Sequence, residues 1–264
     1  MNEALGLTSL GVAAALVLLS AGLSLLLQMG IARSLLVAAV RTVVQLLLVG
    51  LALRSVFALQ SPWLVGLVMV AMLATASYET LSRQQRRFAG WWGAGVGAAT
   101  TLFATVVVTG FALATLRPQP WFAPQVAIPL FGIVLGNVMS GVSITLNAFN
   151  TALARERAAI EAQLALGATR HAALAQVQRN ALRSGMIPII NQMSAAGVIT
   201  LPGMMTGQIL AGMSPFEAAK YQVFALFLLA GAAGLGALGA TLAAAWRATD
   251  ERHRLRLDRT VVPE

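Results

Sequence analysis

The sequence is poor in the residues that usually carry catalysis, redox chemistry and metal binding. It contains no cysteine, which excludes disulfide bonds and thiolate metal sites. Its only lysine is Lys220, in the segment Ser-Pro-Phe-Glu-Ala-Ala-Lys, and a P-loop needs a lysine beside glycines to hold nucleotide phosphates. We therefore expect no ATPase motif and no cofactor bound by this chain.

Intramembrane catalysis is also disfavoured. The two aspartates, Asp250 and Asp258, both follow the last apolar run, so a membrane aspartyl protease lacks its carboxylates. The two histidines lie in charged segments, which argues against a Ser–His dyad in a span. We expect no catalytic residues. The sequence does not define a metal site. Glu79 is the only carboxylate associated with the apolar runs, and the methionines of 186–215 are better explained as packing residues than as metal ligands.

Charged residues make up only 10% of the chain, hydrophobic residues make up 58%, and the mean hydropathy is +0.78. Soluble domains average roughly 25% charged residues, so the composition places this protein in a bilayer. The formal charge of +9 does not indicate nucleic-acid binding. The arginines stand between apolar runs, where they act as topology signals.

Seven stretches have the length of a spanning helix, which needs about 20 apolar residues. They are 4–32, 34–53, 55–78, 88–116, 118–154, 184–216 and 221–246. The sequence thus predicts an all-α polytopic membrane protein, a single permease domain with about seven transmembrane helices. The first stretch exceeds a signal-peptide core and lacks a basic start, so we expect a retained span.

The positive charges alternate in density between the spans. With the N-terminus outside, fourteen arginines fall on the cytoplasmic side, against two arginines and one lysine outside. We therefore expect an outer N-terminus and a cytoplasmic C-terminus. The basic tail, 247–264, is then most simply a solvated end, with contact to anionic lipid as the less favoured alternative.

The longest cytoplasmic loop, 151–185, is rich in good helix formers and is interrupted by Gly167. This pattern predicts a helix, a glycine turn and a second helix. Glu161, Ala162, Gly167 and Val177 resemble the EAA loop of ABC-transporter permeases, although Arg179-Asn180 departs from that pattern. The resemblance implies that a separate cytoplasmic ATPase docks on this loop.

The stretch 186–215 is uncharged, yet it combines polar side chains with helix-breaking residues. The candidate path residues in it are Asn191, Gln192, Pro202, Gly203, Thr206 and Gln208. Polar groups at membrane depth need protein or a cavity around them, which favours a transport path. An interhelical seam is the alternative. We expect the helix to break near Leu201-Pro-Gly203, with Thr206 and Gln208 in a short second segment.

Other polar residues within the spans extend this candidate path. Asn137 lies in the fifth span, Arg41 and Gln45 share a face of the second, and Glu79 lies near the cytoplasmic end of the third. Arg41 and Glu79 carry charge into the membrane. The alternatives to contact with a substrate are a structural pair between them and snorkelling at the interface.

Four segments together resemble the FetB-type permeases, the membrane subunits of a bacterial ABC transporter implicated in iron export. They are Arg41-Thr-Val-Val-Gln45, Ile128–Asn137, Met186–Asn191 and Leu201–Gly212. The resemblance implies a multi-pass protein of the bacterial inner membrane, working as a homodimer with a cytoplasmic ATPase that hydrolyses the ATP. Iron as the cargo comes from this resemblance alone. An ion- or proton-coupled secondary transporter is the alternative, although the inverted repeats expected of one are not evident.

The charges of Arg41 and Glu79 generate the first prediction. A lone charge in a span costs about 2.5 kcal/mol or more, so mutual pairing would be favourable. If they pair, Arg41→Gln and Glu79→Gln should each lower the thermal unfolding temperature in detergent, and the double variant should recover part of the loss. Purely additive losses would rule out the pair.

Overall fold

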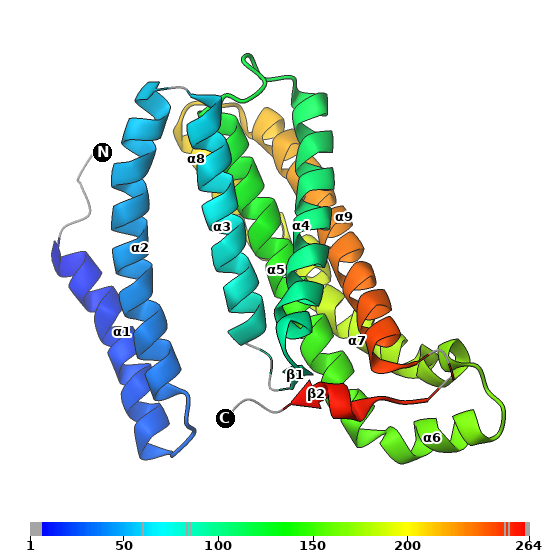
Figure 1. Cartoon of the computed structure of the whole chain (residues 1–264). Helices are drawn as coiled ribbons and strands as arrows, with labels where there is room; N and C mark the ends of the chain where they lie inside the picture. Colours follow the sequence, from blue (N-terminus) through cyan, green and yellow to red (C-terminus); the bar gives the residue numbers. More distant parts are fainter. Residues whose placement is uncertain are drawn as a thin grey trace. The chain divides into compact units, whose positions relative to one another are not determined.

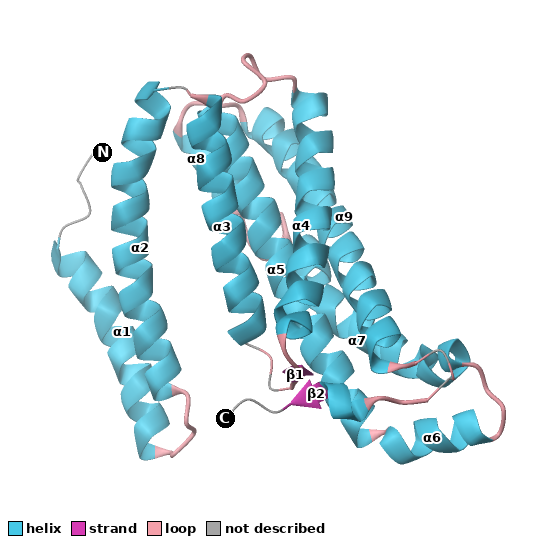
Figure 2. Cartoon of the chain, viewed as in Figure 1, coloured by secondary structure: helices cyan, strands magenta, loops and turns pink. Residues whose placement is uncertain are grey.

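The computed structural model describes residues 7–59, 61–82, 84, 86–250, 252 and 254–261. Helices dominate these residues, as the composition predicts, and they form two compact units, 1–61 and 62–264 (Figure 2). The single permease domain predicted from the sequence stays a prediction, because the compactness of the two units does not test it.

The first unit is a helical hairpin of α1 (Leu7–Leu26) and α2 (Ala32–Leu59). Gly30 and Gln28 adopt positive φ angles in the turn, which reverses the chain within five residues. Most side chains of the hairpin are apolar and exposed, with small residues such as Ala21 and Ser24 at the buried contact. Apolar side chains without a protein neighbour suit contact with lipid.

The second unit is built around α5 (Pro124–Arg155), which packs against four other helices. These are α3 (Pro62–Ser82), α4 (Trp91–Leu116), α7 (Arg170–Ala195) and α9 (Pro215–Ala248). Figure 1 shows the bundle, with α4 and α9 beside α5. The core lies along α5, where Val134, Val138 and Val142 are fully buried.

Glycines let the backbones of this bundle approach closely. A Cβ on Gly185 of α7 would lie 2.8 Å from the Gly141 carbonyl oxygen of α5 and would overlap the Thr145 hydroxyl. A Cβ on Gly236 of α9 would lie 2.8 Å from the Val138 side chain. These small residues replace the hydrophobic effect, which gives little drive to helix association in lipid.

One end of the second unit extends beyond the spans. The 32 residues of α5 make a helix about 48 Å long, against a hydrocarbon core of about 30 Å. Beyond its last turn lies α6 (Arg157–Ala165), and at the same end β1 (Arg87–Phe88) pairs antiparallel with β2 (Thr260–Val261) (Figure 1). We call this the α6 end.

The basic tail is folded back onto the bundle. The Arg256 N–H donates to the Ala248 carbonyl oxygen at 2.8 Å, and a 3-10 turn, η1 (Leu257–Arg259), leads into β2. The Ala89 N–H donates to the Arg259 carbonyl oxygen at 2.7 Å. Residues 254–261 are therefore folded against the bundle, although Arg254 and Asp258 keep exposed side chains, as a solvated end requires. The sequence of the tail does not predict its pairing with β1, because the paired strand is only two residues long and follows a charged segment.

Among the described residues, six helices are long and apolar enough to cross a membrane: α1, α2, α3, α4, α5 and α9. They correspond to six of the seven stretches found in the sequence. The remaining stretch, 184–216, is divided between the second half of α7 and the short α8 (Gly203–Leu210). The polytopic all-α fold is confirmed. The interruption of 184–216 is observed, whereas its crossing of the membrane stays a prediction; we call this stretch the discontinuous span.

The contact at Gly185 generates a stability prediction. Gly185→Ala should lower the unfolding temperature in detergent, because the new methyl group meets a backbone oxygen that cannot rotate away; overpacking of this kind costs about 1–3 kcal/mol. The matched control is Gly231→Ala in α9, where a Cβ meets nothing within 4 Å and helix propensity improves by up to about 1 kcal/mol. Equal effects of the two substitutions would contradict the close approach.

Candidate functional site

The discontinuous span has a defined break. α7 ends at Ala195, and Gly197 follows with a φ of 82°. The Thr200 N–H donates to the Ala195 carbonyl oxygen at 3.0 Å, and the Gly197 N–H donates to the Thr200 carbonyl oxygen at 2.9 Å. Pro202 then caps α8. The break predicted near Leu201 is confirmed, and it begins five residues earlier, at Ala196.

The polar residues of this segment have different surroundings. Asn191 and Gln192, in the last turns of α7, are exposed on the second unit. In α8, which Gly203 opens, the Thr206 hydroxyl donates to the Pro202 carbonyl oxygen at 3.2 Å. The Oε1 atom of Gln208 is buried and accepts no hydrogen bond from the described residues.

Asn137 lies on α5, one turn before the Gly141–Gly185 contact with α7. Its Nδ2 donates to the Ile133 carbonyl oxygen at 2.9 Å, within its own helix. Ser140 makes the same kind of bond to the Gly136 carbonyl oxygen at 2.9 Å. These donors are satisfied locally, so the face they form does not depend on a neighbouring helix for its hydrogen bonds.

The remaining candidate path residues are divided between the two units. Arg41 and Gln45 lie on the exposed surface of α2 in the first unit, whereas Glu79 is half-buried on α3 in the second. The pairing of Arg41 with Glu79 therefore stays a prediction.

A row of buried hydroxyls on α4 was not singled out from the sequence. Thr101, Thr105 and Thr109 are spaced four residues apart and therefore share one face of the helix. At most 4% of each residue is exposed, and their three Oγ1 atoms have no hydrogen-bond partner among the described residues. The sequence feature that could have identified this row is the four-residue spacing of the threonines in an otherwise apolar helix.

The α6 end carries the helix, glycine turn and helix that the loop sequence predicts. Glu161 of α6 accepts a hydrogen bond from Arg157 at 2.8 Å, and Ala162 is exposed. Gly167 takes a φ of 91°, which a side chain would strain, and Thr169 caps α7 by accepting from the Ala172 N–H at 3.3 Å.

The structure separates the four residues of the loop motif into two groups. Glu161, Ala162 and Gly167 are exposed, but Val177 is only 1% exposed and belongs to the core under α7. Leu166, which the motif does not include, is 88% exposed at the end of α6. The apolar side chain that projects from this loop is therefore Leu166.

Within the described ranges, no group of three or more His, Cys, Asp or Glu side chains has the arrangement of a metal site. The buried polar side chains described in the second unit carry mostly hydroxyls and amides.

The family model described as "Uncharacterised protein family (UPF0014)" matches residues 7–248. A UPF0014 membrane protein of Synechocystis is 38% identical over 193 residues, 72% of this chain and 73% of that protein. The "Probable iron export permease protein FetB" of Escherichia coli is 30% identical over 219 residues, 81% of each chain. "Protein ALUMINUM SENSITIVE 3" of Arabidopsis thaliana is 32% identical over 202 residues, 76% of this chain and 72% of that protein. No solved structure matches the chain.

The buried oxygen of Gln208 generates a prediction. Gln208→Leu should leave the unfolding temperature in detergent unchanged or raise it, because a buried polar atom without a partner costs about 1–3 kcal/mol. Asn150→Leu is the matched comparison: it removes the donor to the Arg86 carbonyl oxygen, at 3.1 Å, and should destabilise the protein. A similar loss in both variants would mean that Gln208 stabilises the fold of the protomer.

Proposed function

Because the chain belongs to the UPF0014 family of membrane proteins, we propose that it is the membrane subunit of an ABC transporter. In this proposal a separate cytoplasmic ATPase hydrolyses the ATP, and the permease exports iron or a related small solute. The Escherichia coli relative named as a probable iron export permease supports both the transport role and the cargo.

The exposed surface of α6 is the observation that carries the proposal. Ile160 anchors this helix to the bundle with only 3% exposure, while the opposite face presents the small side chains of Ala158, Ala159 and Ala162. Leu166 projects from its end. A short helix with small side chains and one projecting leucine suits a groove in a partner, where the leucine would be buried.

The helices provide a direct mechanical link from this docking surface to the discontinuous span. α7 begins at Arg170, three residues after the Gly167 turn, and continues as one helix to Ala195. A displacement of α6 would reach the break at 196–202 through this helix, as in rigid-body switching mechanisms. In the proposal, the polar residues of α8 and the exposed amides of α7 contribute to the path between two permease copies.

The secondary transporter remains the competing function. It needs no ATPase and has no use for a docking helix. Co-purification separates the two: a P-loop ATPase bound through α6 supports the ABC permease, whereas proton- or ion-driven transport by the purified chain alone supports the alternative. For the cargo, we expect cells that lack the protein to hold more iron under iron or peroxide stress, and unchanged iron would remove that assignment.

Leu166→Asp should abolish co-purification of the ATPase subunit. Burying a leucine contributes about 1.5–3 kcal/mol, so losing it and burying a charge should weaken binding at least ten-fold. The protein should stay folded, because Leu166 packs on little of its own bundle. The measurement is pull-down of the ATPase with the tagged permease, with size-exclusion elution as the folding check.

Val198→Asp is the matched control. Val198 is 89% exposed, about the same as Leu166, but it lies in the break between α7 and α8. This variant should retain the ATPase. Loss of binding in both variants would indicate general damage, and retention in both would reject α6 as the docking helix.

A further inference from the structure

A basic hollow lies where the C-terminal end of α9, the tail and the start of α7 meet. Its volume is about 570 Å³. Its lining includes six arginines and one aspartate among the described residues: Arg170, Arg247, Arg252, Arg254, Arg256, Arg259 and Asp250. We call it the arginine hollow.

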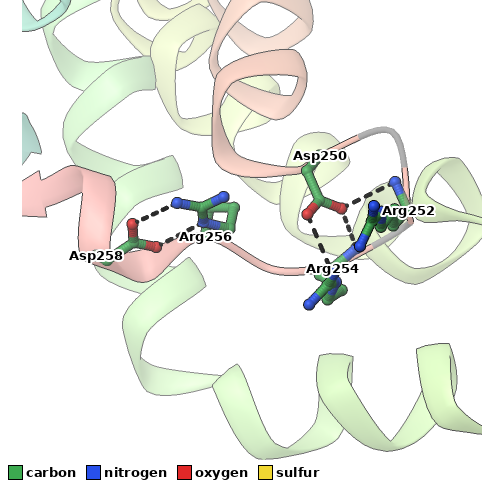
Figure 3. A network of polar contacts seen from close by, with 5 residues as sticks. All are labelled: Asp250, Arg252, Arg254, Arg256 and Asp258. Carbon is green, nitrogen blue, oxygen red and sulfur yellow. Dashed lines mark hydrogen bonds and ion pairs between the residues drawn. The ribbon is translucent and has the colours of Figure 1, made fainter.

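Two ion pairs hold part of the tail in place: Arg254 with Asp250 at 3.6 Å, and Arg256 with Asp258 at 2.9 Å. Asp250 accepts from the Arg252 and Arg254 backbone N–H groups at 3.0 and 2.8 Å, and Arg256 donates two bonds to Asp258 at 2.9 Å (Figure 3). The N–H of Arg254 lowers the pKa of Asp250, and the Arg256 guanidinium lowers that of Asp258. Both carboxylates therefore stay ionised at neutral pH and are already engaged.

Two other arginines make contacts with neutral groups. The guanidinium of Arg247 stacks on the Trp92 ring at 5.0 Å, and Arg259 donates to the Arg247 carbonyl oxygen at 3.0 Å. The Nε atom of Arg247 is buried and has no hydrogen-bond partner within the described part of the chain. The clustered positive charge of the lining indicates a site for an anion.

Aromatic and apolar side chains beside the hollow indicate the kind of anion. The Trp92 ring contacts those of Trp91 and Trp246, at 4.5 and 5.7 Å, and both of these are mostly exposed. A smaller pocket of about 60 Å³ shares Arg170, Trp246 and Thr249 with the hollow and adds apolar side chains such as Leu174 and Leu242. Tryptophans gather at the membrane interface, where headgroups meet acyl chains.

We propose that the arginine hollow binds the headgroup of an anionic phospholipid. The guanidinium groups take the phosphate oxygens, for which their planar fork of donors is suited, and the smaller apolar pocket accepts the adjoining part of the lipid. The bound lipid would hold the tail, α7 and α9 together at the membrane surface. This site goes beyond the proposed transport function and depends only on the chain being a membrane protein.

The test uses the full chain purified in detergent and titrated with phosphatidylglycerol, phosphatidylcholine or inorganic pyrophosphate, with binding read by native mass spectrometry. Phosphatidylglycerol should bind in preference to phosphatidylcholine. Arg252→Gln combined with Arg254→Gln should weaken phosphatidylglycerol binding roughly ten- to thirty-fold, since each basic residue near an anionic membrane surface strengthens binding about five-fold. The paired lysine substitutions should restore most of the binding.

Arg179→Gln combined with Arg183→Gln is the matched control, because it removes the same charge from exposed positions of α7 outside the hollow. It should leave lipid binding almost unchanged. Equal binding of the two lipids, or equal loss in both glutamine pairs, would overturn the proposal. Arginine-dependent binding of pyrophosphate without binding of phosphatidylglycerol would overturn it too, in favour of a soluble phosphate ligand.

Discussion

Close packing of α5 against α3, α4, α7 and α9 is the interaction on which the second unit depends. In lipid, apolar side chains gain little by turning inward, so helix association rests on contact distance and shape. Gly141, Gly185 and Gly236 bring α5, α7 and α9 so near that a methyl group at the second or third would meet backbone or side chain. This packing holds α7 from Ala173 to Ile189 and leaves Asn191 and Gln192 near its C-terminal end exposed.

The break after α7 follows from the same packing. Up to Ile189 the helix is held against the core, but Asn191 and Gln192 are exposed and the chain then turns at Gly197. Non-helical backbone at membrane depth is tolerated where protein or a water-filled cavity surrounds it. The turn bonds between residues 195 and 200 satisfy part of the backbone, and Pro202 and Gly203 restart the helix as α8. A discontinuous helix of this kind suits the lining of a transport path, which must change conformation during transport.

The sequence predicts the features that depend on local chemistry. Apolar length locates the long helices. Gly167 locates the turn because glycine tolerates a positive φ, and Pro202 locates the restart because proline fixes φ. It does not predict features that depend on distant partners. Val177 matches a surface motif but lies in the core, the tail pairs with residues 87–88, and the row of threonines on α4 gains its meaning only from burial. In each case the decisive neighbour lies far away in the chain.

The helix lengths explain why so many features meet at the α6 end. α5 and α9 have 32 and 34 residues, so they exceed the about 20 residues that cross the hydrocarbon core by about 12 and 14 residues. The part of α5 beyond the hydrocarbon core leads into α6. The corresponding part of α9 leads into the tail, which pairs with β1 and lines the arginine hollow. α7 begins between them and runs to the discontinuous span. A protein that binds α6, or a lipid that binds the hollow, therefore acts on a helix that ends at the polar segment of the bundle.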